Sequence, residues 1–234
     1  TTWTATLTPT ASVTQTGDVI TLDNTGVSDA AGNAGSGTTH SNTYAVDTQR
    51  PNATVVFANT NLGVGQTSLV TITFSEAVVG FTNADLTVSN GTLSAVSSSD
   101  GGITWTATFT PTASIVSASN HITLDNTGVQ DTAGNAGSGT TTSNNVVIDG
   151  VRPTATVVVA NHSLIIGQTS LVTITFSEAV VGFSNADLTI ANGTLSAVSS
   201  SDGGITWTAN FTPTASITNA SNVITLDNTG YSDT

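Results

Sequence analysis

The sequence contains no cysteine, no methionine and no lysine, and its 234 residues include only two arginines, Arg50 and Arg152. Without cysteine, disulfide bonds and thiolate metal sites are excluded. Without lysine, covalent bonds between lysine and asparagine side chains cannot stiffen the fold. Two arginines cannot form the basic patch that nucleic acids or anionic membrane surfaces require, so we expect neither as a partner.

Charge of either sign is scarce. Charged residues make up 7% of the chain, against about 25% in average soluble domains. The net charge of −13 arises because 15 acidic residues face almost no basic ones, so cations are the natural partners. No apolar run approaches the ~20 residues of a membrane span. A surface made of Thr, Ser, Asn and Gly is typical of an extracellular or cell-surface protein.

The chain repeats itself with a period of 102 residues. Trp3, Trp105 and Trp207 lie 102 residues apart, and residues 48–132 and 150–234 are identical at 68 of 85 positions without any insertion. Such self-similarity at a fixed period indicates a tandem array. The near-identity of the copies indicates recent duplication.

The repeat phase divides the chain into unequal domains. We interpret residues 1–46 as the C-terminal part of one repeat, 47–149 as a complete repeat, and 150–234 as the N-terminal part of a third repeat that lacks its last strand. An incomplete domain cannot bury a core alone. We therefore expect the chain to be a piece of a longer array. The alternative is a subunit whose ends are completed by neighbouring chains through strand addition.

Apolar residues alternate with threonine along the chain. In "ITWTATFT" (103–110) and "LVTITFSE" (69–76) the period is two, which predicts half-buried strands and makes Trp105 a core residue. Several short strands without any helical pattern predict an all-β fold of tandem immunoglobulin-like sandwiches. The expected strands are 53–58, 69–75, 85–89, 92–97, 103–110, 120–125 and 144–149. The repeat phase further predicts that the first and last of these pair at the domain edge.

Four stretches carry a resemblance to a known family. "TITFSEAVVGFTNADLTVSNGTLSAVS" (71–97), "WTATFTPTA" (105–113), "DTAGNAGSG" (131–139) and "VVIDGVRPTATV" (146–157) resemble the bacterial immunoglobulin-like repeats of giant surface adhesins. The resemblance covers the whole chain. It implies a secreted or cell-surface, non-enzymatic, extended array, and some related adhesin repeats bind calcium at their domain junctions.

The acidic residues of each period are expected at one end of the sandwich. Glu76 and Asp85 flank the loop between the second and third strands, Asp131 lies in the last loop, and Asp47 leads into the first strand. A hard cation such as Ca²⁺ takes six to eight oxygen ligands from carboxylates, carbonyls and water. We therefore expect Ca²⁺ sites at two junctions, formed by Asp47, Glu76, Asp85 and Asp131 and by Asp149, Glu178, Asp187 and Asp233.

Two other interpretations of these carboxylates remain open. They can cap turns through bonds to the backbone and keep a poorly charged surface soluble. Arg50 can instead neutralise the group by bidentate pairing. Asp100, in "SSDGG", is interpreted as a turn residue, and Asp125, in "LDNTG", fits either role.

No enzyme is expected. His40, His121 and His162 do not share a repeat phase, no catalytic triad partner is evident, and a sandwich end offers no cleft for paired catalytic carboxylates. The first functional hypothesis is a spacer in a giant adhesin, whose partners are further copies of the repeat in the same chain. The alternatives are a subunit of an extracellular fibre or sheath made with other chains, and a carbohydrate- or protein-binding module. The binding module is disfavoured because the aromatic residues lie in core phase.

Overall fold

The structure is a computed structural model that describes residues 1–234. It contains two compact units, Thr1–Gly150 and Val151–Thr234. Regular structure is almost entirely β, with 26 short strands and four 3-10 helices of three residues each. None of these helices is long and apolar enough to span a membrane.

The first 47 residues contain two strand pairs. The elements are β1 (Thr14–Asp18), β2 (Thr21–Asp23), η1 (Asn24–Gly26), β3 (Thr38–His40) and β4 (Tyr44–Asp47). β1 pairs with β4 and β2 pairs with β3, both antiparallel. The apolar side chains of this region stay largely exposed, and Trp3 is 90% exposed.

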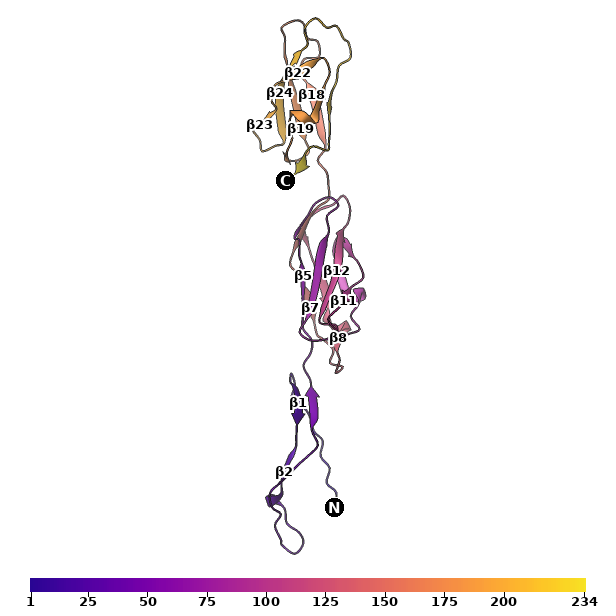
Figure 1. Cartoon of the computed structure of the whole chain (residues 1–234), viewed down its shortest axis with the longest axis vertical. Coiled ribbons are helices and arrows are strands. Elements are labelled where there is room, and N and C mark those ends of the chain that lie inside the picture. Colours follow the sequence, from indigo (N-terminus) through magenta and orange to yellow (C-terminus); the bar gives the residue numbers. More distant parts are fainter. The chain divides into compact units, whose positions relative to one another are not determined.

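One layer of the complete repeat is an antiparallel sheet in the order β10-β12-β7-β5, with β11 also paired to β12. Its strands are β5 (Ala53–Phe57), β7 (Ser68–Phe74), β10 (Gly91–Leu93), β11 (Ser97–Ser98) and β12 (Thr104–Pro111). Figure 1 shows β5, β7 and β12 side by side. The expected alternation in β7 is confirmed, because Val70, Ile72 and Phe74 are buried.

The second layer is made of shorter ladders. Its elements are β6 (Asn61–Leu62), β8 (Val78–Val79), η2 (Asn83–Asp85), β9 (Leu86–Val88), β13 (Val116–Asn120), β14 (Ile122–Asp125), η3 (Asn126–Gly128), β15 (Gln130–Asp131), β16 (Thr140–Thr142) and β17 (Val146–Asp149). β17 lies between β13 and β6, and β14 lies between β16 and β9. β8 pairs with β15 and so joins the loop after β7 to the loop after η3.

Apolar side chains from both layers form one core. Val55, Ile72 and Phe109 of the first sheet belong to the same buried cluster as Ile122 and Ile148 of the second. Trp105 packs against this cluster as expected. Its ring meets Phe81 edge-to-face at 5.2 Å, and its Nε1–H donates to the carbonyl of Gly102 at 3.1 Å.

Pairing at the domain edge differs from the prediction. β5 pairs with β7, and the last strand, β17, pairs in parallel with the two-residue strand β6. The chain leaves the first sheet after Phe57 and joins the second at Asn61. The side chain of Asn144 joins the two predicted partners: it accepts from the N–H of Phe57 at 2.8 Å and donates to its carbonyl at 3.2 Å.

The second unit repeats most of this architecture. Its elements are β18 (Ala155–Val159), β19 (Ser170–Phe176), β20 (Val180–Val181), η4 (Asn185–Asp187), β21 (Leu188–Ile190), β22 (Gly193–Leu195), β23 (Ser199–Ser200), β24 (Thr206–Pro213), β25 (Ile224–Leu226) and β26 (Ser232–Asp233). The sheet order β18-β19-β24-β22 matches that of the complete repeat (Figure 1). Its core cluster holds six buried residues against fourteen in the first unit, so this unit is the less completely packed of the two.

Candidate metal centre

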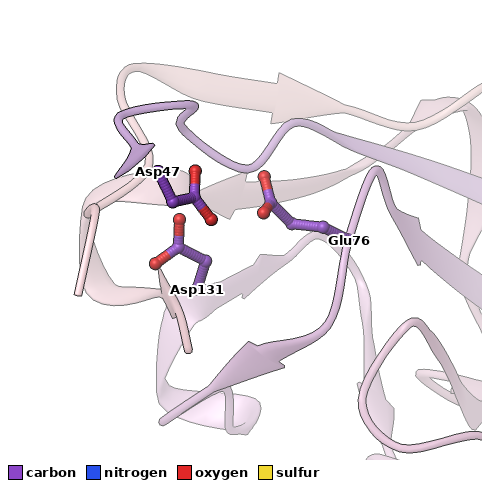
Figure 2. Close-up of side chains that lie close together, drawn as sticks. All are labelled: Asp47, Glu76 and Asp131. Atoms are coloured by element: carbon purple, nitrogen blue, oxygen red, sulfur yellow. The ribbon is translucent and has the colours of Figure 1, made fainter. Parts of the chain in front are cut away.

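Three of the predicted carboxylates converge. Asp47 is the last residue of β4, Glu76 lies two residues after β7, and Asp131 ends β15. Each offers a carboxylate oxygen, and these oxygens all lie within 4.8 Å of one another. Figure 2 shows the three side chains pointing toward a common centre. The end of β4, the loop after β7 and the end of β15 thus contribute to one group, called here the acidic triad.

Asp131 is held rigidly in this group. It is 1% exposed, and its Oδ1 accepts from the backbone N–H groups of Ala133 and Asn135, both at 2.8 Å. Its Oδ2 accepts from Nδ2 of Asn135 at 2.8 Å. Burial alone raises the pKa of Asp131, but the hydrogen bonds from Asn135 and the neighbouring backbone outweigh it and lower that pKa below its usual value. Asp131 therefore stays ionised.

Asp47 is tied to the same loop. Asn135 Nδ2 also donates to the backbone carbonyl of Asp47 at 3.1 Å, so one amide side chain links the end of β4 to Asp131. Oδ1 of Asp47 accepts from the hydroxyl of Thr14 at 2.9 Å and from the N–H of Gln49 at 3.1 Å. These bonds hold the carboxylate in place.

Glu76 is the member of the triad whose buried carboxylate oxygen receives no hydrogen bond. Its Oε1 is buried and has no hydrogen-bond partner. Burial, followed by the negative charges of Asp131 and Asp47, raises the pKa of Glu76 above its ordinary value. A buried acceptor without a partner is costly, typically ~1–3 kcal/mol. The geometry thus places an unsatisfied oxygen beside two further carboxylates.

One interpretation of the sequence pairs Arg50 with the triad, but in the structure Arg50 bonds elsewhere. Its guanidinium donates to the backbone carbonyl of Ala136, and Oε1 of Glu76 has no donor. The arginine therefore fastens the loop after Asp131 to the segment after β4, and it leaves Glu76 uncompensated.

Asp85 lies outside the triad, contrary to the expectation. Its Oδ2 accepts from the N–H of Thr82 at 2.8 Å, and the hydroxyl of Thr82 accepts from the N–H of Ala84 at 3.2 Å. This reciprocal arrangement is a capping box at the start of η2. Oδ1 of Asp85 faces Gly128, where an added Cβ would lie 2.1 Å from it. Asp187 forms the same capping box with Ser184 in the second unit.

We therefore expect Asp85→Ala to destabilise the first unit by about 0.5–2 kcal/mol, the usual cost of losing a capping side chain. Urea unfolding with and without Ca²⁺ checks this. The loss should be the same in both, because Asp85 does not face the triad. A loss that appears only with Ca²⁺ would make Asp85 a ligand after all.

Asp100 and Asp125 are turn residues in the structure. Both oxygens of Asp100 accept from the N–H of Thr104, at 2.9 and 3.0 Å, and Oδ1 accepts from the hydroxyl of Ser98. These bonds, led by the one from the Thr104 backbone, lower the pKa of Asp100 to about 2. Asp125 is the N-cap of η3 and accepts from the N–H of Thr127.

The second predicted group is distributed over both units. Asp149 ends β17 in the first unit. In the second unit Glu178 follows β19 and Asp233 ends β26. β20 pairs with β26 as β8 pairs with β15, so these two residues hold the positions that Glu76 and Asp131 hold in the first unit.

Comparison with known proteins supports the fold. The family model described as bacterial Ig-like domain matches the chain three times, over residues 1–46, 47–148 and 149–234. No curated protein matches the sequence significantly. Among solved structures, the Escherichia coli adhesin FdeC is similar, with 13% sequence identity and a TM-score of 0.44. The alignment covers 79% of this chain and 67% of the adhesin chain.

The three family matches together extend over the whole sequence. They agree with the two-layer β architecture of the complete repeat and confirm the all-β, immunoglobulin-like fold expected from the strand pattern. The chain therefore belongs to the family of bacterial immunoglobulin-like domains.

Proposed function

We propose that this chain is a non-enzymatic segment of an extracellular array on a bacterial surface. In this proposal it acts as a spacer in an adhesin, and Ca²⁺ bound at the acidic triad stiffens the connection between successive repeats. Family membership, the 102-residue repeat and a composition with no lysine and only two arginines support the array. The observation that carries the role of the cation is the convergence of Asp47, Glu76 and Asp131.

The donor set suits a hard divalent cation. All three side chains offer carboxylate oxygens, which Ca²⁺ and Mg²⁺ prefer, whereas softer metals prefer nitrogen and sulfur. Asp131 is kept ionised by its hydrogen bonds, and Glu76 has a buried oxygen with no partner. A bound cation would satisfy that oxygen and remove the repulsion among the three charges. Ca²⁺ is favoured over Mg²⁺ because it tolerates irregular, protein-rich coordination.

The position of the triad explains how a cation would act on the array. Asp47 ends β4, the strand that enters the complete repeat from the preceding one, whereas Glu76 lies in the loop after β7 and Asp131 ends the short strand β15. Only residues 48–52 separate β4 from β5. A cation held by all three carboxylates would fix this connection, whereas the metal-free charges would repel one another and loosen it.

Calcium titration of the whole chain tests the proposal. Extracellular calcium modules bind at about 10⁻⁴–10⁻³ M, and a ligand at 100 times its dissociation constant stabilises the folded state by about 2.7 kcal/mol. We expect the unfolding transition of the first unit to rise with added Ca²⁺ and to fall back on chelation. Small-angle X-ray scattering should show a narrower range of chain dimensions with Ca²⁺.

The chain offers a matched control for this titration. Asp29 makes the same loop contacts as Asp131, accepting from the backbone of Ala31 and from Asn33, but it is exposed and faces no triad. We expect Asp131→Asn to abolish the calcium effect and Asp29→Asn to preserve it. If Ca²⁺ changes neither stability nor dimensions, or if both variants respond alike, the proposed cation role is wrong.

A further inference from the structure

The two connections between successive repeats differ in their side chains. The first, "TQRPN" (48–52), follows β4, and the second, "GVRPT" (150–154), follows β17. β4 pairs with β1 in the same register as β17 pairs with β13 one period later. The two connections therefore leave equivalent strand ends, and their differences lie in the residues that hold the chain there.

Two hydroxyl groups fasten the first connection to the segment that leads into β1. The N–H of Thr48 donates to the carbonyl of Val13 at 2.8 Å. The hydroxyl of Thr48 accepts from the N–H of Val13 at 3.1 Å and donates to the carbonyl of Thr10 at 2.7 Å. The hydroxyl of Thr14 donates to Oδ1 of Asp47 at 2.9 Å. Thr14 and Thr48 are called here the hydroxyl clamp.

The second connection keeps the backbone contact without the hydroxyl clamp. Val116 and Gly150 stand where Thr14 and Thr48 stand one period earlier. The N–H of Gly150 donates to the carbonyl of Ile115 at 2.7 Å, as that of Thr48 does to Val13, but neither Val116 nor Gly150 has a hydroxyl group to add.

The backbone does not require glycine at position 150. Gly150 is not among the residues with positive φ, so its conformation is open to residues with a side chain. A Cβ added there would lie 3.1 Å from the carbonyl oxygen of Ile115, which is a close contact. Thr48 carries a side chain at the matching position of an equivalent strand end, so threonine can be accommodated.

The first connection is also bonded to the repeat that follows it. Nδ2 of Asn135 donates to the carbonyl of Asp47 at 3.1 Å, and the guanidinium of Arg50 donates to the carbonyl of Ala136. Together with the hydroxyl clamp, these bonds hold residues 47–50 from both sides. None of them requires a cation.

Glycine and threonine restrict a connection to different degrees. Glycine has the largest backbone freedom to lose on ordering, whereas the β-branched side chain of threonine is stiff at χ1. A hydrogen bond from a side chain to the neighbouring backbone further lowers the population of locally opened conformers. Replacing threonine with glycine therefore removes two restraints at once.

We propose that the residue at position 48 or 150 sets the stiffness of its connection. Thr48 makes the first connection a fixed joint, and Gly150 makes the second a hinge. This role rests on the proposed array, in which joints of both kinds let an extended spacer bend at chosen places. It is separate from the cation, because the side chain of Thr48 bonds Val13 and Thr10 and no member of the acidic triad.

Spin labels test the proposal in the whole chain, which has no cysteine of its own. Cysteines introduced at Thr16 and Thr108 span the first connection, and those at Thr108 and Asn210 span the second. All three side chains are exposed. Double electron–electron resonance with chelator measures the width of each distance distribution. We expect Thr48→Gly to broaden the first distribution and Gly150→Thr to narrow the second, and each variant should leave the other connection unchanged.

Two further variants separate the hydroxyl from the backbone restriction. Thr48→Val keeps the β-branch and loses the hydroxyl. It should accelerate hydrogen exchange of the Val13 amide about two- to tenfold, the effect of losing one hydrogen bond, while the buried Ile72 exchanges as before. Gly150→Ala restricts the backbone without adding a hydroxyl, so it should narrow the second distribution less than Gly150→Thr does.

These measurements do not depend on the proposed cation role, because they are made with chelator. If Ca²⁺ has no effect on the chain, the expected widths stay the same. If either glycine–threonine exchange leaves its own connection unchanged, the proposal is wrong, whatever Ca²⁺ does. It is also wrong if Thr48→Val does not change exchange at Val13, or if Gly150→Ala narrows the distribution as much as Gly150→Thr.

Discussion

Replacing Phe109 with alanine is expected to lower the free energy of unfolding of the complete repeat by about 3–5 kcal/mol. The side chain is 0% exposed and meets Phe57 edge-to-face at 5.1 Å. Its ring also lies over Gly91, where an added Cβ would come within 2.3 Å of Cε2. With such close packing on two sides, the cavity left by truncation cannot collapse without moving β5 or β10, the strands that carry Phe57 and Gly91.

Phe211, the counterpart in the second unit, is the matched control. It also lies over a glycine, Gly193, but it is only partly buried. Phe211→Ala should therefore cost clearly less, because less apolar surface returns to water. Hydrogen exchange resolved by segment separates the two units. Equal losses in both would show that the partial exposure of Phe211 does not weaken its packing.

Much of the fold follows from local pattern in the sequence. The alternation in residues 69–75 faces Val70, Ile72 and Phe74 inward because successive side chains of a strand point to opposite sides. The sequence pattern does not predict the short strand β6, because its two residues, Asn61 and Leu62, are too few to show any period. The predicted strand 120–125 is divided at His121, since its two halves pair with different partners.

The sequence predicts three residues of the candidate site but not all of its properties. The sequence predicts that Asp47, Glu76 and Asp131 converge, because the topology of the sandwich places the segments that carry them at the same end. The loop position of Asp85 does not predict its place outside the triad, because its side chain bonds the local backbone at Thr82 instead. "TNAD", residues 82–85, is a capping-box pattern of the type Ser/Thr-x-x-acid. The missing partner of Glu76 Oε1 is a tertiary property that no sequence pattern displays.

Glu76→Gln is expected to change stability in opposite directions without and with calcium. In metal-free protein the uncharged amide removes repulsion with Asp47 and Asp131 and offers them an N–H donor. A hydrogen bond to a charged group contributes about 1.5–3 kcal/mol, so the first unit should become more stable by roughly 1–3 kcal/mol. With Ca²⁺ at about 100 times its dissociation constant, the variant should lack the ~2.7 kcal/mol that the unmodified chain gains.

The pH dependence gives an independent test of the same residue. Because the pKa of Glu76 is raised in the folded protein, the folded state keeps a proton that the unfolded state releases just above the ordinary carboxyl pKa of 4.5. Metal-free stability should therefore fall as pH rises from that value to the raised pKa, and stay low above it. Glu76→Gln should remove this decrease.

Asp29→Asn serves as the control for both experiments, because it removes one negative charge from an exposed loop and Asp29 is not a member of the triad. Urea unfolding of the three proteins at pH 4 to 8, with chelator and with Ca²⁺, provides the measurement. The control should follow the unmodified chain in every condition. If Glu76→Gln destabilises the metal-free protein at neutral pH, the carboxylate of Glu76 is compensated in the folded state by a group other than a cation. The triad would then be a structural feature of the loop ends, and the calcium-stiffened junction would have to be abandoned.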